Sequence, residues 1–186
     1  MKPSAEGLLS QVGAHKGPPP VHLWNPPYCG DLDIRIARDG TWFYLGTPIG
    51  RAPLVKLFAS ILKREGDAYF LVTPVEKVGI RVDDAPLLAT DFTATGSGRD
   101  QNLHFVTRTE DEAAADATHR ITVKTSESGE PSPYIHVRDG LNALIDRKSF
   151  YRLVELGCHE ADSDESWFGL WSHGQFFPVI RSAELP

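Results

Sequence analysis

The sequence predicts an α+β fold made of two related, β-rich halves. Three observations lead to this fold class. Runs of alternating apolar and polar residues, typical of strands, occur along most of the chain. Helical spacing of apolar residues is confined to a few short segments, and the order of these elements repeats. With 186 residues, 41% of them apolar and 24% charged, the chain is long enough for one large or two small globular domains.

The first 28 residues predict a short helix followed by an extended arm. Residues 4–12 place Leu8, Leu9 and Val12 on one side of a helix. The prolines of residues 17–20 and 26–27 then favour an extended backbone that lies over the surface of the protein.

Residues 29–109 form the predicted first domain, which begins with a hairpin. Leu32, Ile34 and Ile36 alternate as in a half-buried strand, and Asp39-Gly40 predicts a tight turn before the strand at residues 42–45. A helix beginning near residue 50 follows, because apolar residues recur at helical spacing from Leu54. The remaining predicted strands cover residues 69–72, 75–82, 87–95 and 102–107.

Residues 110–186 form the predicted second domain. An acidic, alanine-rich segment at 110–117 predicts a short helix or a linker. A helix over residues 147–156 follows the strands at 119–125 and 134–137, with Asp146 as its N-cap and Gly157 as its stop. A hairpin of residues 167–171 and 175–180 ends the chain.

The two halves align at an offset of 96 residues, which indicates a duplication. The offset matches Ile49 with Ile145 and Arg51 with Arg147, so that the starts of the two predicted helices coincide. Each half then has the order strand–strand–helix–strand–strand.

Composition excludes several classes of protein. A net charge of −6 argues against binding a nucleic-acid polymer or lying on an anionic membrane. There is no apolar run long enough to span a membrane and no secretion signal at the start, so we expect a cytoplasmic protein. Cys29 and Cys158 are isolated from each other, and adjacent ligand types at residues 158–160 rarely converge on one ion; we therefore expect no disulfide framework, no metal and no cofactor.

Two arginines are the strongest candidates for binding a ligand. Arg51 and Arg147 fall at the predicted first position of their helices, where free backbone N–H groups favour an anion and a positive side chain is unfavourable. A guanidinium beside those N–H groups predicts capture of a phosphate or carboxylate. The alternative is an ion pair with a carboxylate of the protein, for which Asp31, Asp33 and Glu76 are candidates.

Aromatic and charged residues near the first helix extend this hypothesis. If Phe43 is in the core, alternation directs Trp42 and Tyr44 to the opposite face, where their rings could stack on a base. The alternative is that they pack inside the protein. Glu76 and Lys77 are neighbours in a strand and therefore point to opposite faces, so one of them faces inward or lies at an interface, unless both charges belong to a solvated edge.

Signatures of catalysis are scarce. The sequence contains no Gly-x-Gly-x-x-Gly, phosphate-binding loop, Gly-x-Ser-x-Gly or His-Glu-x-x-His. Cys29 has no histidine placed to activate it. We therefore assign no catalytic residue and expect a protein that is not an enzyme.

Several long motifs resemble the bacterial domain-of-unknown-function family numbered 1285. The resemblance implies two related α+β halves, the second superficially like a pleckstrin-homology barrel. It also implies a cleft between the halves for a nucleotide-type ligand, and a role in signal transduction. The motifs that carry the resemblance are Cys29–Ile34, Asp39–Trp42, Gly46–Ile49, Leu54–Phe58, Leu71–Lys77, Asp84–Pro86, Val137–Leu141 and Ala143–Ile145.

Three hypotheses for function follow. The first is a sensor or regulatory module that binds a small anionic ligand of the nucleotide type between its halves, through Arg51, Arg147 and Lys77. The second is an enzyme acting on a phosphorylated or carboxylated small molecule, with Asp31, Asp33 or Glu76 as acid or base. The third is a protein-interaction adaptor or a homodimer, which requires an exposed apolar patch. The residues for that patch are Trp167, Trp171, Phe176 and Phe177.

Overall fold

The computed structural model describes residues 3–12, 17–162 and 165–185, and it divides into two compact units. The first unit comprises Met1–Leu87 with Asp139–Leu141, and the second comprises Leu88–Arg138 with Asn142–Pro186. Each unit combines a six-stranded sheet with helix, which confirms the predicted α+β class.

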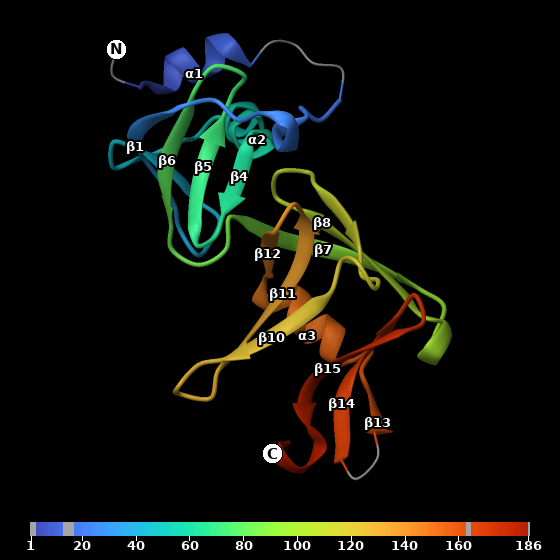
Figure 1. The fold of residues 1–186 in the computed structure, drawn as a ribbon. Coiled ribbons are helices and arrows are strands. Elements are labelled where there is room, and N and C mark those ends of the chain that lie inside the picture. The colour runs from blue at the N-terminus through green and yellow to red at the C-terminus, as the bar shows by residue number, and fades with distance from the viewer. Residues whose placement is uncertain (1–2, 13–16, 163–164, 186) are drawn as a thin grey trace. The chain divides into compact units, whose positions relative to one another are not determined.

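The sheet of the first unit has the strand order β3-β2-β1-β6-β5-β4 (Figure 1). β1 and β6 run parallel at its centre, and every other neighbouring pair is antiparallel. Two three-stranded meanders are thus joined through their first and last strands. The strands are β1 (Tyr28–Ile36), β2 (Trp42–Tyr44), β3 (Thr47–Pro48), β4 (Leu62–Glu65), β5 (Ala68–Val72) and β6 (Lys77–Val82).

The predicted hairpin at the start of this sheet is confirmed. β1 and β2 pair with Ile36 opposite Trp42 and Ile34 opposite Tyr44. The turn between them closes where Ala37 N–H donates to Thr41 O at 2.9 Å. Directly opposed residues share a face of the sheet, so Trp42 lies on the same face as the fully buried Ile36.

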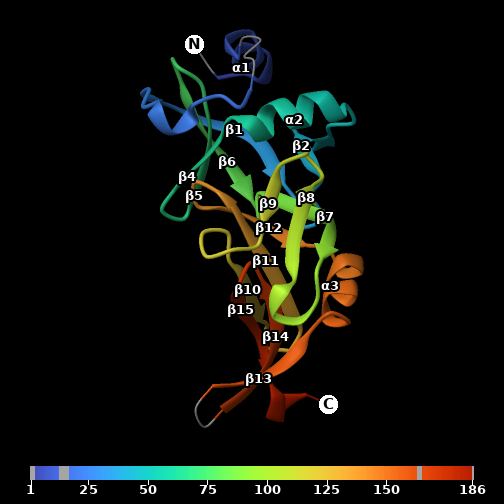
Figure 2. The ribbon, with the colours of Figure 1, turned by 90° about the vertical axis from the view of Figure 1, so that its right-hand side faces the viewer.

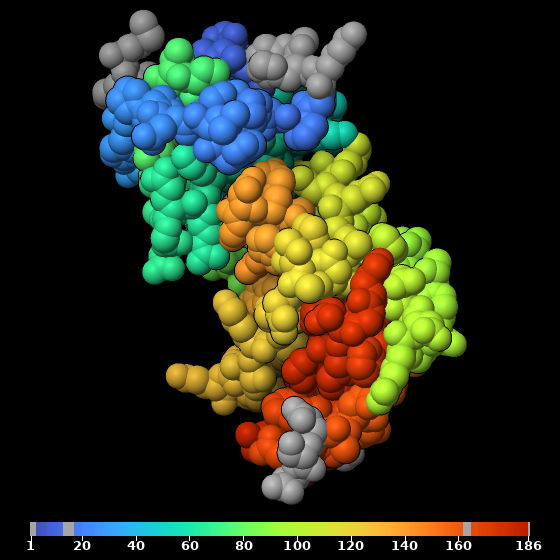
Figure 3. Space-filling model, turned by 45° about the vertical axis from the view of Figure 1, so that its right-hand side comes forward, coloured from blue at the N-terminus to red at the C-terminus, as the bar shows by residue number. Residues whose placement is uncertain are grey.

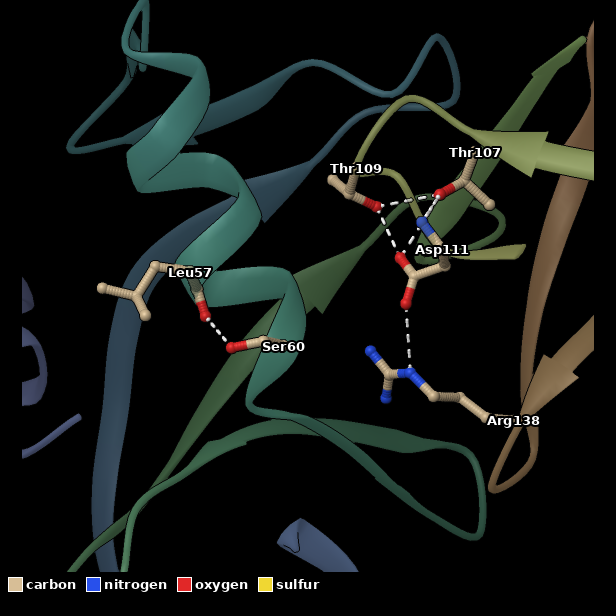
Figure 4. Close-up of polar contacts among 6 residues, drawn as sticks. All are labelled: Leu57, Ser60, Thr107, Thr109, Asp111 and Arg138. Atoms are coloured by element: carbon tan, nitrogen blue, oxygen red, sulfur yellow. Dashed lines mark hydrogen bonds and ion pairs between the residues drawn. The ribbon is translucent and has the colours of Figure 1, made fainter. Parts of the chain in front are cut away.

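Helix α2 (Ala52–Ser60) connects the two meanders and begins two residues later than the sequence indicated. Arg51 is its N-cap rather than its first helical residue, because the backbone of Arg51 is still extended. The helix lies beside the hairpin (Figure 2). It packs there through Phe58, whose ring stacks on Trp42 with centroids 6.2 Å apart. In the last turn, Ser60 Oγ donates to Leu57 O at 2.6 Å (Figure 4).

The N-terminal segment packs on this unit as well. α1 (Ala5–Gln11) is capped by Ser4, whose Oγ accepts from Gly7 N–H, and Leu8 is fully buried. The proline-rich arm contains the short 3-10 turn η1 (Val21–Leu23), which contacts β4. Lys63 Nζ donates to Trp24 O at 3.0 Å, so the arm is held to the sheet by polar as well as apolar contacts.

The sheet of the second unit has the order β10-β11-β12-β7-β8-β9. β7 and β8 pair with strands of this unit, so the division falls at 87/88 and not at the predicted 109/110. The segment predicted as a helix or linker contains β9, in which Ala113 is buried opposite Phe105. The strands are β7 (Leu87–Thr95), β8 (Asn102–Thr107), β9 (Glu112–Ala114), β10 (Ile121–Thr125), β11 (Pro131–Arg138) and β12 (Leu141–Ile145).

This second sheet is strongly curled. β9 contacts β11 although three strands separate them in the sheet order. Among the described strands, the edges β9 and β10 do not pair with each other, so the sheet is a half-barrel rather than a closed pleckstrin-homology-like barrel. Helix α3 (Arg147–Val154) follows β12 and buries Leu153; it begins at the predicted residue and ends two residues before the predicted end at 156.

The duplication is visible in the sheets and not in the helices. Numbered within its own unit, each sheet has the strand order 3-2-1-6-5-4. α2 follows the third strand of its unit, whereas α3 follows the sixth strand. The first strands of the two sheets, β1 and β7, begin at Tyr28 and Leu87, so the sheets repeat at an offset of 59 residues. The offset of 96 residues therefore aligns two helices that occupy different places in the repeated topology.

A third, smaller sheet completes the second unit. It has the order β13-β14-β15, formed by Cys158–Asp162, Glu165–Ser172 and Gln175–Arg181. Ser172 Oγ accepts from Leu103 N–H at 2.9 Å, which ties this sheet to β8. The turn η2 (Gly98–Asp100) contacts β14, and Figure 3 shows this part of the chain, in yellow-green, against the red C-terminal strands. None of the helices in the described chain is both long enough and apolar enough to span a membrane.

Candidate functional site

Arg51 is exposed at the start of α2. No side chain caps this helix end, and Pro53 removes one of its free N–H groups. Within the described part of the chain, the Arg51 side chain makes no hydrogen bond or ion pair. It is therefore a cation available to a ligand, although it is the N-cap and not the first helical residue.

Arg147 is the first residue of α3, as predicted, but its guanidinium already has a partner in the protein. Asp146 caps the helix by accepting from Ser149 N–H at 2.8 Å. Arg147 Nη2 lies 2.7 Å from Glu130 Oε1, and both side chains are more than 60% exposed. This pair matches the alternative that each arginine binds an internal carboxylate, with Glu130 in place of the three carboxylates considered.

Trp42 is not available for stacking on a ligand. Its side chain is only 2% exposed and belongs to the core with Phe58. The condition for stacking was a Phe43 in the core, and it is not met, because Phe43 is half-buried and the Arg35 guanidinium lies 4.4 Å from its ring centroid. For Trp42 the alternative of packing inside the protein holds. Tyr44 is half-buried on the same face as Trp42.

Glu76 and Lys77 bind different partners. Lys77 Nζ lies 2.8 Å from Glu65 Oε2 and 4.9 Å from the centre of the Phe70 ring. The hydrogen bond from Lys77 lowers the pKa of Glu65 below its usual value of 4.5. Glu76 Oε1 accepts from Gln11 Nε2 at 2.8 Å, which ties the end of α1 to the sheet. Glu76 lies in the turn before β6, so the two residues are not neighbours within one strand as predicted, and the charge of Lys77 is balanced locally by Glu65.

The carboxylates considered as acids or bases are also engaged. Asp31 Oδ1 accepts from Tyr28 OH at 2.7 Å, and this hydrogen bond raises the pKa of Tyr28 above 10.0. Asp33 pairs with Arg81 at 2.8 Å on the surface of the sheet. Across the described residues, no three His, Cys, Asp or Glu side chains form a group that could hold a metal ion.

A hollow with exposed aromatic walls lies on the third sheet. We call it the aromatic groove, and its volume is about 440 Å³. Trp167, Trp171 and Phe176 are half-buried and expose part of their rings to it, whereas Phe177, predicted for the same patch, is fully buried. The groove is lined by Arg99, Glu160, Ala161, Trp167, Trp171, Phe176 and Pro178.

Strand register explains how these residues share a face. Trp167 and Trp171 are four residues apart in β14 and therefore point to the same side. Glu160 of β13 is opposite Trp167, and Phe176 of β15 is opposite Trp171. Gly169 lies between the two tryptophans, and an added Cβ there would lie 2.6 Å from Phe176 Cζ, so the glycine makes room for that ring.

A three-membered polar network forms one end of the groove. Arg99 Nη2 donates to Glu160 Oε2 at 2.9 Å, and Trp171 Nε1 donates to Glu160 Oε1 at 2.9 Å. The Arg99 guanidinium also lies over the Trp171 ring, 5.1 Å from its centroid. The hydrogen bond from Arg99, followed by that from Trp171, lowers the pKa of Glu160, so this carboxylate is ionised at neutral pH.

A similar arrangement occurs at Trp167. Arg181 is paired with Trp167 across the strands, and its guanidinium lies 5.5 Å from the centroid of the ring. Glu165 Oε1 lies 3.5 Å from Arg181 Nη1. Each tryptophan of the groove therefore carries a guanidinium that is also paired with a glutamate.

Cys158 lies in β13, two residues before Glu160, and is half-buried. Burial raises the pKa of its thiol above 9.0, and the negative charge of Glu160 adds to this effect. The thiol is therefore neutral at physiological pH, in contrast to a reactive cysteine.

Two other polar sites of the second unit are structural. A hollow of about 450 Å³ along β7, β8 and β9 includes Asp91, whose carboxylate is paired with Arg152. In the loop after β8, Asp111 accepts from Thr109 Oγ at 2.8 Å and from Arg138 Nε at 3.2 Å (Figure 4). Asp91 and Asp111 are therefore engaged in contacts within the protein: Asp91 binds Arg152 of α3, and Asp111 binds Thr109 within the loop after β8 and Arg138.

Sequence reasoning found the aromatic part of the groove and missed its polar part. Trp167, Trp171 and Phe176 were named as part of an exposed apolar patch that the adaptor hypothesis requires. Arg99 lies in the turn η2 and Glu160 in the strand β13, 61 residues apart in sequence, so no local sequence pattern connects them. The one available signal was the alternation of Cys158 and Glu160, which is typical of a strand.

These features define a class: a two-domain α+β protein with a duplicated six-stranded sheet and an aromatic groove on an added third sheet. The comparisons with known proteins give the family. The N-terminal domain of the DUF1285 domain of unknown function matches residues 19–85, and the C-terminal domain of the DUF1285 protein of unknown function matches residues 86–179. The chain belongs to the DUF1285 family, as its motifs indicated, and the family domains meet within two residues of the boundary seen in the structure.

Two solved structures are similar to this chain. One is a DUF1285 family protein from Silicibacter pomeroyi DSS-3, at 60% identity, covering 97% of this chain and 98% of that one with a TM-score of 0.88. The other is a DUF1285 family protein from Shewanella baltica OS155, at 35% identity, covering 67% of this chain and 91% of that one with a TM-score of 0.53. No curated protein matches the sequence.

Proposed function

We propose that this DUF1285 protein is a non-catalytic interaction module whose aromatic groove binds a segment of a partner polypeptide. The observation that carries the proposal is the partial exposure of Trp167, Trp171 and Phe176 on one face of the third sheet. Exposed aromatic rings next to a buried apolar core are typical of sites that anchor a partner. This corresponds to the adaptor hypothesis rather than to the sensor hypothesis.

The groove has the size and the composition needed for a peptide side chain or two. Its volume of about 440 Å³ lies within the range of 300–1,000 Å³ that ligand sites occupy. Aromatic walls supply contact area, and the Arg99–Glu160 pair supplies charged groups at one end. A small set of polar groups in an aromatic hollow favours a specific segment over non-specific adsorption.

The test is selection of peptides from a random phage library on the immobilised protein. We expect enrichment of a common motif on the wild type and its loss on Trp171→Ala. The control is Tyr151→Ala, which removes an aromatic side chain that is 62% exposed on α3, outside the groove. Failure to enrich any motif on the wild type would overturn the proposal. Sedimentation that shows a dimer, lost in Trp171→Ala, would also overturn it and establish the homodimer instead.

A second candidate function rests on Arg51. Its exposed guanidinium, beside an α2 N-terminus that no side chain caps, favours a small phosphate-bearing ligand such as a nucleotide. Arg147, Lys77, Glu76 and Trp42 contribute less to this candidate, since the first three have partners in the protein and Trp42 is buried. A role in signal transduction would follow from such a ligand.

Thermal denaturation with a panel of nucleotides and inorganic phosphate tests this second candidate. A ligand at 100 times its Kd stabilises the folded state by about 2.7 kcal/mol, which raises the melting temperature measurably. Arg51→Ala should abolish the rise, and Arg147→Ala should retain it. If no nucleotide raises the melting temperature, the candidate fails.

A further inference from the structure

We propose that the aromatic groove binds an arginine side chain of the partner polypeptide, and that Arg99 occupies the same place within the protein until the partner displaces it. This inference rests on the proposed interaction function and names the chemistry of its ligand. It depends on the contacts that surround the Arg99 guanidinium.

The first step is that Trp171 and Glu160 together form a receptor for a guanidinium. The indole face attracts a cation through its π system, and the carboxylate accepts hydrogen bonds from two nitrogens of one guanidinium. Arg99 Nη2 lies 2.9 Å from Glu160 Oε2, and Arg99 Nε lies 3.4 Å from Oε1. Trp171 Nε1–H holds the same Oε1 at 2.9 Å, so the carboxylate is oriented before any ligand arrives.

The second step is that Arg99 is held loosely enough to be displaced. Its side chain is 71% exposed, whereas that of Glu160 is only 25% exposed. Arg99 lies in the turn η2, and it follows Gly96 and Gly98, both of which have positive φ. The base of this turn is anchored separately, because Gln101 Nε2 donates to Trp171 O at 2.9 Å. The Arg99 side chain can therefore leave while the turn stays in place.

The third step is that the groove surface favours a cation. Glu165 lies on β14, which carries both tryptophans, and Glu160 lies on the neighbouring strand β13, opposite Trp167. The whole chain has a net charge of −6. Trp167 repeats the arrangement with Arg181 and Glu165. A guanidinium lies over each of the two indole rings, so this surface has the shape and charge to accommodate arginine side chains. Because Arg99 and Arg181 are parts of the chain, a partner arginine competes with them rather than adding to them.

The experiment uses three acetylated hexapeptides that differ at one position, which is arginine, lysine or citrulline. Binding is followed through the indole N–H resonances of the four tryptophans in nuclear magnetic resonance spectra. We expect the arginine peptide to shift the Trp171 resonance and the citrulline peptide, which has the same shape but no charge, to leave it unchanged. Glu160→Gln should abolish the shift.

Arg99→Ala is the decisive variant. If Arg99 is an internal competitor, its removal should tighten binding of the arginine peptide by about five-fold, the effect expected when an exposed pair of about 1 kcal/mol no longer competes. Arg147→Ala is the matched control, because Arg147 is as exposed as Arg99 and is paired with a glutamate outside the groove; it should leave the shift of Trp171 unchanged. Weaker or unchanged binding to Arg99→Ala would overturn the inference, as would equal binding of the citrulline peptide.

The failure of this inference and that of the proposed function are distinguishable. If library peptides without arginine bind the wild type and depend on Trp171, the interaction function stands and the arginine assignment falls. If no library peptide and no arginine peptide binds, both fail. Unfolding curves of Arg99→Ala and Glu160→Gln confirm that the variants are folded at the temperature of the binding measurement.

Discussion

Substitution of Gly169 by alanine tests the packing on which the aromatic groove depends. The new Cβ would lie 2.4 Å from Phe177 O, 2.6 Å from Phe176 Cζ and 3.0 Å from Pro178 Cα. Two of these three atoms belong to the backbone of β15, which is hydrogen-bonded to β14 and cannot move independently of it. Either the two strands separate or the Phe176 ring leaves its place over the glycine.

The cost follows from the size of this overlap. Forcing an extra carbon into a packed site destabilises a protein by about 1–3 kcal/mol. Alanine also restricts the unfolded chain, which returns about 0.4–1 kcal/mol. We therefore expect a net loss of roughly 1–2 kcal/mol and, at about 2–4 °C per kcal/mol for a chain of this length, a melting temperature lower by roughly 2–8 °C.

The assay is thermal and urea denaturation followed by tryptophan fluorescence. Gly50→Ala is the matched control, because Gly50 is exposed, has no atom within 4 Å of an added Cβ and does not have positive φ. We expect this control to stay within about 0.5 kcal/mol of the wild type. If Gly169→Ala unfolds at the wild-type temperature, the close packing of β15 on β14, and the reasoning from it to the groove, is refuted.

Three further predictions follow from contacts outside the groove. Asp146→Ala removes the side chain that caps α3 by accepting from Ser149 N–H, and should lower the free energy of unfolding in urea by about 0.5–2 kcal/mol. Arg147→Ala breaks an exposed ion pair and should lower it by less than about 1 kcal/mol. Equal losses in the two variants would contradict the assignment of Asp146 as a cap and of Arg147 as a surface pair. Iodoacetamide at pH 7.5 should alkylate the exposed Cys29 faster than Cys158, whose raised pKa keeps the thiol protonated, and mass spectrometry of the peptides would reveal the opposite order. Glu65, Asp91 and Glu160 have lowered pKa values in the folded state. Their ionised forms therefore stabilise the folded state at a pH above the unfolded pKa, which is 3.8 for Asp and 4.5 for Glu, and this stabilisation is lost as the pH falls through the lowered pKa values. The melting temperature should therefore be nearly constant from pH 6 to 8 and should fall below about pH 4; a melting temperature unchanged at pH 3 would contradict this.

Local sequence patterns predicted most individual elements because their signals are local. The Asp39-Gly40 turn determined the hairpin, and the register of that hairpin also contained the answer for Trp42. With Ile36 directly opposite, Trp42 had to share the buried face, which selects packing inside the protein over stacking on a ligand. A cross-strand comparison would have decided between these two alternatives from sequence alone.

Long-range pairing was the part that local patterns could not supply. Residues 87–107 have clear strand alternation, but alternation does not say which sheet a strand joins. Most residues of β13 are polar, so its sequence does not show the apolar–polar alternation by which a strand is recognised. The duplication was inferred from helices, whose apolar stripes match easily, whereas the real repeat is in the order of sheet pairing.

The same distinction explains why the groove was half predicted. Its aromatic residues come from one hairpin, in which the spacing of Trp167 and Trp171 already places them on one face. Its charged residues meet only because the turn after β7 reaches the third sheet, an arrangement held by Gln101 and by Ser172. Contacts of this kind depend on tertiary packing and have no signature in a single sequence.

The position of the groove in the fold bears on how substitutions there will behave. Both units share one strand order, and the third sheet is an addition that follows α3 in the second unit only. The core of the curled sheet is made by other residues, such as Phe105 and Ile135, which are buried within it. Because Trp167 and Trp171 are only half-buried on the added sheet, replacing them removes contact area for a partner while most of the apolar core remains. Binding and folding can therefore be separated by mutation at this site, which is the condition that the peptide experiments require.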